Sequence, residues 1–185
     1  MRKLFVGAVL ALALPVAVAQ ADDSTAVSAK TLAKQACKTE KAQMGTKTFK
    51  LTYATKSAAR ATEKCVAKTL PATTEAKQNA AQTCAAERDL DPAAFAEKYG
   101  ANGKEGTKGF GKNAFGKCVS TLAKQQSQEE TEDRVDAAAS CKALDEATFV
   151  STYGTKKNAF GKCVSATAKA NAEDDETGTE TETQS

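Results

Sequence analysis

Six cysteines fall into three pairs, and the same landmarks stand between the two members of each pair. A phenylalanine is followed four residues later by a tyrosine, and a Lys-Cys-Val triplet then closes the unit. The landmarks are Cys37, Phe49, Tyr53 and Lys64–Val66 in the first unit, Cys84, Phe95, Tyr99 and Lys117–Val119 in the second, and Cys141, Phe149, Tyr153 and Lys162–Val164 in the third. The second and third units also share the segment NAFGKCVS, at 113–120 and 158–165. This agreement predicts an internal repeat of three units.

The local signals within a unit are helical. Asp91 stands where a helix cap is expected, Pro92 takes the first helical position, and a glycine follows as terminator. The segment Asp145–Gly154 repeats this plan. A further helix is expected to begin at Asn113 in the second unit and at Asn158 in the third. After Asn113, Phe115, Cys118, Val119 and Leu122 then recur at i, i+3, i+4 and i+7, which forms an apolar stripe. No useful stretch alternates with period two, and isoleucine is absent. The sequence therefore predicts an all-α fold of three small, disulfide-stapled helical repeat units.

The organisation expected from these landmarks has five parts. They are a signal peptide at 1–21, a divergent first unit at 22–72, a second unit at 73–129 with a glycine-rich loop at 100–112, a third unit at 130–172, and a disordered acidic tail at 173–185. The first unit is divergent because it carries Arg-Ala-Thr-Glu where the other two have Asn-Ala-Phe-Gly.

Disulfides are expected because the apolar core is small. Leu, Ile, Val and Phe make up 18 of the 164 residues after the leader, about half the share usual in globular domains. A disulfide that closes a loop of roughly 20 to 35 residues stabilises the fold by about 3 to 4 kcal/mol in the entropy model. Each unit most simply carries its own bond, which pairs Cys37 with Cys65, Cys84 with Cys118 and Cys141 with Cys163. The competing pattern links neighbouring units through Cys65–Cys84 and Cys118–Cys141 and leaves the outer two cysteines to meet.

The N-terminal segment has the parts of a secretory signal peptide. A basic start is followed by an uncharged apolar run of about 16 residues and an Ala-Gln-Ala cleavage site that ends at Ala21. The alternative is a membrane anchor, but a spanning helix needs roughly 20 apolar residues. We therefore expect a secreted protein, extracellular or in the cell envelope, that is not inserted in a membrane after cleavage. Disulfides form in such compartments.

Charge is distributed unevenly along the remaining chain. The six acidic residues of 173–185 leave 24 basic residues against 17 acidic ones in the part before them, a net charge of +7. The tail has no large apolar residue whose burial could offset the entropy of ordering its backbone, so we expect it to be disordered.

Glu105–Ser120 contains a G-x-x-x-x-G-K pattern at Gly106–Lys112, which is the phosphate-binding loop of nucleotide hydrolases without its last residue. Such a loop should follow a buried strand and place Ser or Thr after its lysine. Here the preceding element is expected to be a helix, and Asn113 follows the lysine. The third unit lacks the segment altogether. The sequence therefore predicts a glycine-rich insertion rather than a nucleotide site, with no cofactor and no bound metal.

Several catalytic classes are excluded by composition. The chain has no histidine, no tryptophan and no C-x-x-C pair, so His-dependent hydrolases, His-ligated metals and thioredoxin-like redox sites are not available. Adjacent Lys-Cys residues could indicate an activated thiol, but they recur in every unit and favour structural disulfides. Glu87, Asp89 and Asp91 form the densest carboxylate cluster, which we interpret as a helix cap and solvated surface rather than an acid–base pair.

Repeated lysines are the main functional hint. Lys64, Lys117 and Lys162 occupy equivalent positions, and Lys68, Lys124 and Lys169 lie one or two turns further on. A row of such charges could bind an anionic polymer of the cell envelope or an acidic protein, and nucleic acid is the poorest fit among these partners. The alternative is a solvated helix surface in which lysine serves helix propensity and solubility.

The NAFGKCVS segments and the Asp-x-x-x-Phe-x-x-x-Tyr-Gly run before each of them resemble repeats in secreted actinobacterial proteins that have no assigned activity. The resemblance covers the second and third units and implies a secreted, bacterial, modular protein. No catalytic or binding residue carries over from it.

The function expected from the sequence is a non-catalytic structural or binding role, with anionic polymer held by the repeated lysines. The alternative is a small secreted enzyme that uses carboxylate or lysine residues in a cleft between units.

Overall fold

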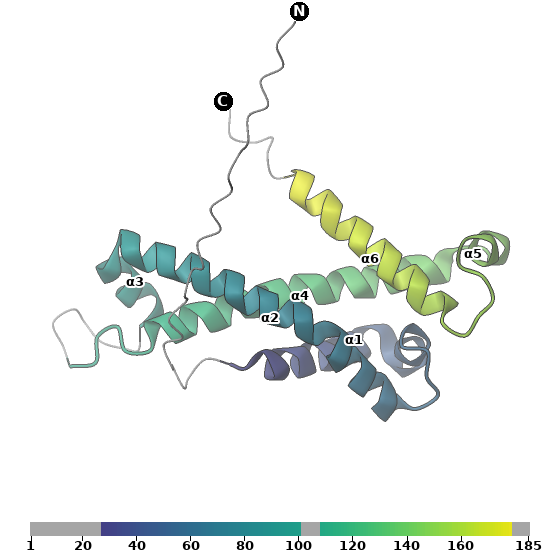
Figure 1. The fold of residues 1–185 in the computed structure, drawn as a ribbon, viewed down its shortest axis with the longest axis horizontal. Coiled ribbons are helices and arrows are strands. Elements are labelled where there is room, and N and C mark those ends of the chain that lie inside the picture. Colours follow the sequence, from purple (N-terminus) through teal and green to yellow (C-terminus); the bar gives the residue numbers. More distant parts are fainter. Residues whose placement is uncertain (1–26, 101–107, 179–185) are drawn as a thin grey trace, which may run out of the picture.

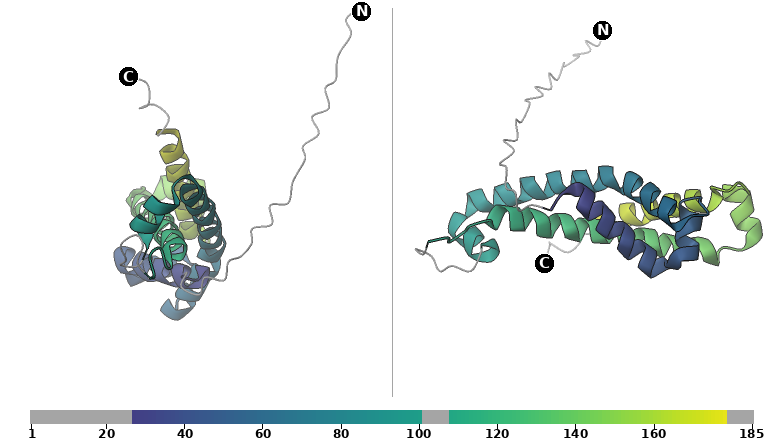
Figure 2. Two further views of the ribbon diagram at one scale, coloured as in Figure 1. Left: turned by 90° about the vertical axis from the view of Figure 1, so that its left-hand side faces the viewer. Right: turned by 90° about the horizontal axis from the view of Figure 1, so that it is seen from below.

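The computed structural model describes residues 27–100 and 108–178, with side chains as far as residue 172. Six helices and no strand occur in these residues (Figure 1). The helices are α1 (Ala29–Thr52), α2 (Ala58–Leu90), α3 (Pro92–Tyr99), α4 (Ala114–Ala143), α5 (Glu146–Tyr153) and α6 (Ala159–Gly178). The long helices α1, α2, α4 and α6 form an elongated body in Figure 1 and in the right-hand view of Figure 2, and the short helices α3 and α5 lie near its two ends. The fold is therefore all-α, as the sequence predicts. The signal peptide expected at 1–21 lies outside the described residues.

Consecutive units share a helix instead of being joined by a linker. Cys65 and Cys84 both lie on α2, and Cys118 and Cys141 both lie on α4. The unit boundaries expected at 72/73 and 129/130 therefore fall inside continuous helices. The closing helix of one unit is the opening helix of the next, so no loop separates consecutive units.

Each disulfide joins the opening long helix of a unit to its closing one. The bonds are Cys37–Cys65, Cys84–Cys118 and Cys141–Cys163, the arrangement expected for repeated units. Each bond lies at the centre of its own small apolar cluster. Between the clusters, α2 and α4 bury threonine and serine instead of large apolar residues: Thr69, Thr73, Ser127 and Thr131. The interior is thus three small cores, which explains the need for one staple in each.

A short helix carrying the Phe–Tyr pair closes the far end of each unit. The ring centroids are 4.9 Å apart for Phe95–Tyr99 and 5.6 Å apart for Phe149–Tyr153. In the first unit this short helix is the last part of α1, which changes direction at Gly45, where φ is 77°. A glycine tolerates this left-handed conformation without steric cost. The divergent first unit thus keeps the same plan with a kink in place of a capped break.

The caps expected at the two separate short helices are confirmed. Asp91 accepts hydrogen bonds from the backbone N–H groups of Ala93 and Ala94, and Asp145 accepts one from Thr148. Asn113 differs from expectation, because its side chain makes no capping hydrogen bond and its φ is 63°. Asparagine tolerates the left-handed region, so this residue ends a turn before α4 rather than capping the helix.

Acid is expected to loosen the start of α5, which Asp145 caps. The hydrogen bond from the Thr148 backbone lowers the pKa of Asp145 below 3.8, so the cap stabilises the fold above that ordinary value and is lost as pH falls through the lowered one. The Thr148 amide proton resonance should titrate with a midpoint below 3.8. Asp145→Asn, which still caps but does not titrate, should abolish the transition, and an unchanged transition would refute this origin.

The glycine-rich loop does not have the setting of a nucleotide site. Helix α3 precedes it, and its described part is a series of turns that includes Gly109 and Gly111 at positive φ. Gly106, the first glycine of the pattern, lies outside the described residues.

Helix α6 runs further than the sequence predicts. It continues to Gly178 and so includes the first part of the segment expected to be disordered. Extending an existing helix costs much less than nucleating one, and the alanine-rich stretch before residue 173 supplies the nucleus. Residues 179–185 lie outside the described part.

Candidate functional site

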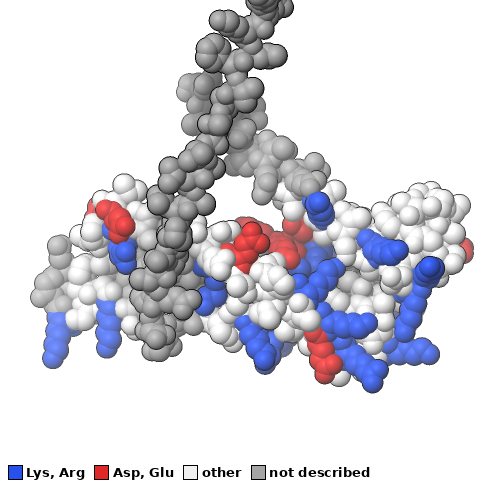
Figure 3. All heavy atoms as spheres, in the orientation of Figure 1, with Lys and Arg blue, Asp and Glu red and all other residues white. Residues whose placement is uncertain are grey.

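A hollow lies where the end of α1, the first half of α2 and the start of α6 meet. Its volume is about 620 Å³. Polar side chains reach it from two long helices, and none of the described residues that line it is acidic. The lining residues are Thr52, Tyr53, Ala54, Lys64, Lys68, Asn158, Gly161, Lys162, Ser165 and Ala166. On the face drawn in Figure 3, lysine and arginine side chains gather over this half of the molecule. We call it the α2–α6 hollow.

Helical spacing places the polar side chains on facing surfaces. Lys64 and Lys68 are one turn apart on α2. Asn158 directly precedes α6, and Lys162 and Ser165 follow it on α6 at spacings of four and seven residues. Residues at these separations share one face of a helix. The cysteines of both helices point inward to the disulfides, so the lysines that precede them point outward into the hollow.

Gly161 sets how closely α6 approaches α1. A Cβ atom at this position would lie 2.3 Å from the carbonyl oxygen of Thr52, a contact that no side chain can make without moving backbone. The glycine of the NAFGKCVS motif therefore allows α6 to contact the backbone at the end of α1 closely.

Gly161→Ala is expected to push α6 away from the end of α1. Such overpacking typically costs roughly 1–3 kcal/mol, measurable as a lower midpoint in urea unfolding. Lys162→Ala, an exposed change at the next residue, is the control and should leave the midpoint nearly unchanged. Equal midpoints for Gly161→Ala and the unmodified protein would show that the backbone contact is not tight in solution.

The lysine that precedes the second cysteine of a unit has a structural role in two units. Lys64 Nζ donates to the carbonyl oxygen of Tyr53 at 3.1 Å, and Lys117 Nζ donates to that of Gly100 at 3.2 Å. Both carbonyls lie where a short helix ends and leaves acceptors unsatisfied. Recurrence of lysine at this position therefore has a local cause as well as a functional interpretation.

Lys68 makes the contact that joins the two walls of the hollow. Its Nζ donates to Ser165 Oγ at 2.5 Å, and the Ser165 hydroxyl donates to the carbonyl oxygen of Gly161 at 2.7 Å. Partial burial, followed by the positive charge of Arg134, lowers the pKa of the Lys68 ammonium, while Glu40 and Glu130 oppose this shift.

A second, smaller hollow repeats the α6 half of the first. It has a volume of about 390 Å³ at the start of α4 and is lined by Val27, Asn113, Gly116, Lys117, Ser120 and Thr121. Four of these residues occupy the motif positions of Asn158, Gly161, Lys162 and Ser165. The facing wall differs, because the Val27 backbone N–H donates to Ser120 Oγ at 3.2 Å where Lys68 contacts Ser165.

The six predicted lysines are distributed unevenly between the two hollows. It brings Lys64, Lys68 and Lys162 together from two units, and it places Lys117 in the second hollow. Lys124 and Lys169 line neither hollow.

The carboxylate cluster after Cys84 is engaged in local contacts. Glu87 binds Lys98 at 2.7 Å and the Tyr99 hydroxyl at 3.1 Å. These hydrogen bonds, the one from Lys98 first, lower the pKa of Glu87. Asp89 contacts Arg88, and Asp91 caps α3. The cluster is therefore explained by helix ends and surface pairs.

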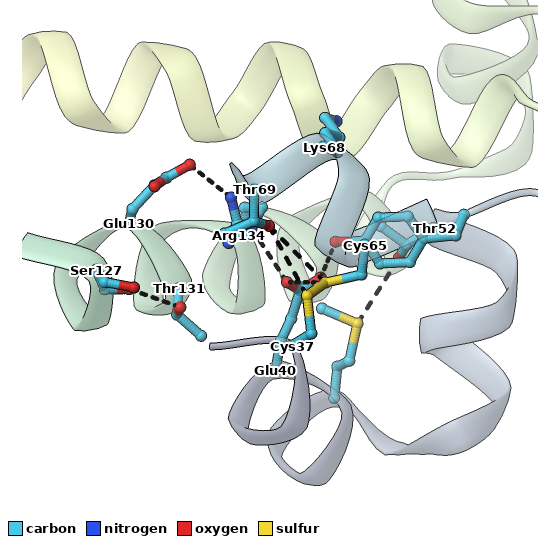
Figure 4. Close-up of polar contacts among 12 residues, drawn as sticks. Cys37, Glu40, Thr52, Cys65, Lys68, Thr69, Ser127, Glu130, Thr131 and Arg134 are labelled. Carbon is cyan, nitrogen blue, oxygen red and sulfur yellow. Dashed lines mark hydrogen bonds and ion pairs between the residues drawn. A yellow bond between two sulfur atoms is a disulfide. The ribbon is translucent and has the colours of Figure 1, made fainter. Parts of the chain in front are cut away.

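A buried charge network behind the α2–α6 hollow is not evident from the sequence. Glu40 is fully buried and accepts from the Tyr53 hydroxyl at 2.8 Å and from Arg134 Nε at 3.1 Å. Arg134 Nη1 also donates to Glu130 at 2.6 Å, while its buried Nη2 has no partner among the described residues (Figure 4). Burial raises the pKa of Glu40 even though Arg134 acts in the opposite direction.

The sequence contains a pattern that could have indicated the Glu40–Tyr53 half of this network. Glu40 and Glu87 each follow the first cysteine of their unit by three residues, and each accepts from the tyrosine of its short helix. The third unit has Leu144 at this position. Arg134 has no such signal, since its partner lies 94 residues away in the chain.

Other site chemistries find no support in the described residues. All six cysteines are in disulfides, and no group of three or more Cys, Asp or Glu side chains in the described part is arranged to hold a metal ion. The described helices include none that is both long and apolar enough to span a bilayer. No protein-family model, curated protein or solved structure matches this chain.

Proposed function

We propose that this chain is an exported binding protein, built from three repeated helical units, that holds an anionic polymer in the α2–α6 hollow. The observation that supports this proposal most directly is the convergence of Lys64, Lys68 and Lys162 in a hollow with no acidic lining residue among those described. Three amines from two units make a concave field that attracts anions. The exposed amide of Asn158 and the hydroxyl of Ser165 add hydrogen-bonding groups to the same wall.

Export is proposed from the signal-like leader and from the three disulfides. The disulfides fit an extracellular protein, and the leader has the basic, apolar and small-residue regions that a signal peptidase reads. Polymers at a cell surface that carry phosphate or carboxylate groups are the ligand class that matches both the location and the charge of the hollow.

Linear inorganic polyphosphate is a suitable probe for this proposal. Binding to the chain without its leader should weaken as salt rises, with log K falling linearly against log salt concentration. Replacing Lys64 and Lys162 together by glutamine should lower the affinity at least tenfold and reduce the salt slope by roughly one for each lysine.

Lys124→Gln is the matched control, because Lys124 is an exposed lysine that lines neither hollow. The control should leave both affinity and slope unchanged. Binding that is insensitive to salt, or that falls as much in the control as in the double variant, would contradict the proposal. An acidic protein that binds more tightly than polyphosphate at the same salt would instead assign the hollow to a protein partner.

A further inference from the structure

We propose that Ser165 and Lys68 form a nucleophile–base pair that cleaves carboxylic esters bound in the α2–α6 hollow. Lys68 Nζ lies 2.5 Å from Ser165 Oγ, within the reach that proton transfer requires. The two residues come from the first and the third unit and are 97 positions apart in the chain. Both line the 620 Å³ hollow, so a substrate there can reach the serine oxygen. This activity goes beyond binding and uses the proposed function only for the charge of the substrate.

The surroundings of Lys68, which is an exposed residue, shift its acid–base equilibrium in the direction of the neutral form. Partial burial and the nearby Arg134 guanidinium lower its pKa, which is the direction that a lysine base requires. Groups from every adjoining element face it, and they are Arg134 and Glu130 from α4, Glu40 from α1, Lys64 from α2 and Lys162 from α6. Glu40 and Glu130 oppose the shift but are themselves bound to Arg134.

The reaction balances with these two side chains and water. Ser165 Oγ bonds to the ester carbonyl carbon while Lys68 Nζ takes the hydroxyl proton. The bond between that carbon and the alcohol oxygen then breaks, and Lys68 returns the proton to the departing alkoxide. A water molecule attacks the resulting acyl-serine, and Lys68 takes its proton and passes it to Ser165 Oγ as the acid leaves. Lys64 and Lys162 lie in the same hollow, where their charges can stabilise the oxyanion and attract an anionic substrate.

The resting hydrogen bonds are consistent with this step. The Ser165 hydroxyl proton points to the Gly161 carbonyl oxygen, and a charged Lys68 donates to the same Oγ. When Lys68 loses a proton, the lone pair on its Nζ can accept the Ser165 hydroxyl proton without a change in the Nζ–Oγ distance. Reactivity is therefore expected to rise with pH as Lys68 deprotonates.

An uncharged alkyl fluorophosphonate tests the pair without a known substrate, because it phosphonylates an activated serine and releases fluoride. Peptide mapping of the chain without its leader should find the adduct on Ser165, with a rate that increases from pH 6 to pH 10. Lys68→Met should slow labelling by about 100-fold, the lower end of what a general base contributes. Glu130→Gln, which removes a carboxylate that opposes the shift, should lower the pKa of Lys68 further and move the pH profile to lower values.

Ser120 is an internal control. It occupies the same motif position in the second hollow, where its Oγ is contacted by the Val27 backbone N–H, so it should remain unlabelled and Ser120→Ala should not change the rate. Absence of a Ser165 adduct at every pH, or equal labelling in Lys68→Met, would overturn the inference. Since the test needs no anion, its failure would leave polyphosphate binding untouched, and loss of polyphosphate binding would not prevent labelling.

Discussion

Reduction of the three disulfides is expected to abolish the cooperative unfolding transition. The bonds close loops with sequence separations of 28, 34 and 22 residues, and each contributes about 3.5 kcal/mol in the entropy model. Together they contribute about 10 kcal/mol, comparable with the whole stability of an ordinary domain. Circular dichroism melting with and without a phosphine reductant under mild denaturant measures the loss.

Single bonds provide the graded version of this experiment. Replacing both Cys84 and Cys118 by alanine should destabilise the second unit while the other two bonds remain intact. Because α2 and α4 continue into the neighbouring units, the unfolding midpoint of the whole chain should fall with it. If the reduced protein melts as cooperatively as the oxidised one, the apolar cores are sufficient without disulfides. If the variant unfolds only in its second unit, the units are independent of one another. Either result would contradict the expectation.

Removing one partner of the buried Glu40–Arg134 pair is expected to have the second largest effect. Glu40 is fully buried and the Arg134 side chain is 7% exposed. Glu40→Gln leaves the guanidinium in the interior with Glu130 as its remaining charged partner, and the loss of one member of a buried pair typically costs about 3–5 kcal/mol. Urea unfolding of the oxidised protein gives the free energy directly.

Glu87→Gln is the matched control, because Glu87 has the same position in the second unit and also accepts from a tyrosine hydroxyl, but pairs with an exposed lysine at the surface. The loss of stability in Glu87→Gln should be much smaller than in Glu40→Gln. The double variant Glu40→Gln with Arg134→Met should recover part of the stability, since it removes the unpaired charge. Equal losses at Glu40 and Glu87, or no recovery in the double variant, would contradict a role for buried charge.

The parts of the fold that follow from local patterns could be predicted from the sequence. Asp91 and Asp145 identify helix starts because a carboxylate before a helix satisfies N–H groups that have no other partner. The Phe–Tyr spacing of four places both rings on one helical face, and the repeated cysteines indicate one bond in each unit. The cap predicted at Asn113 was wrong, since asparagine is suited both to capping and to the left-handed turn that it adopts.

The candidate site could not be predicted because it depends on how distant segments meet. Lys68 and Ser165 are 97 residues apart, and Glu40 and Arg134 are 94 apart, so helical periodicity relates neither pair. The sequence identifies the lysines of the hollow but not their grouping, which is decided by the sharing of α2 between two units and by the contact of Gly161 with the end of α1. The buried charges were missed because an isolated Glu or Arg on a polar helix is normally exposed.

Mapping of polyphosphate on the oxidised chain by backbone amide NMR tests the central claim most directly. During titration at low salt, we expect the largest shift changes at Lys64, Lys68, Lys162 and Ser165, with smaller ones around Lys117 in the second hollow. The changes should disappear together as salt is raised. Shifts that centre instead on Lys124, Lys169 or other exposed lysines, with the α2–α6 hollow unaffected, would contradict the account.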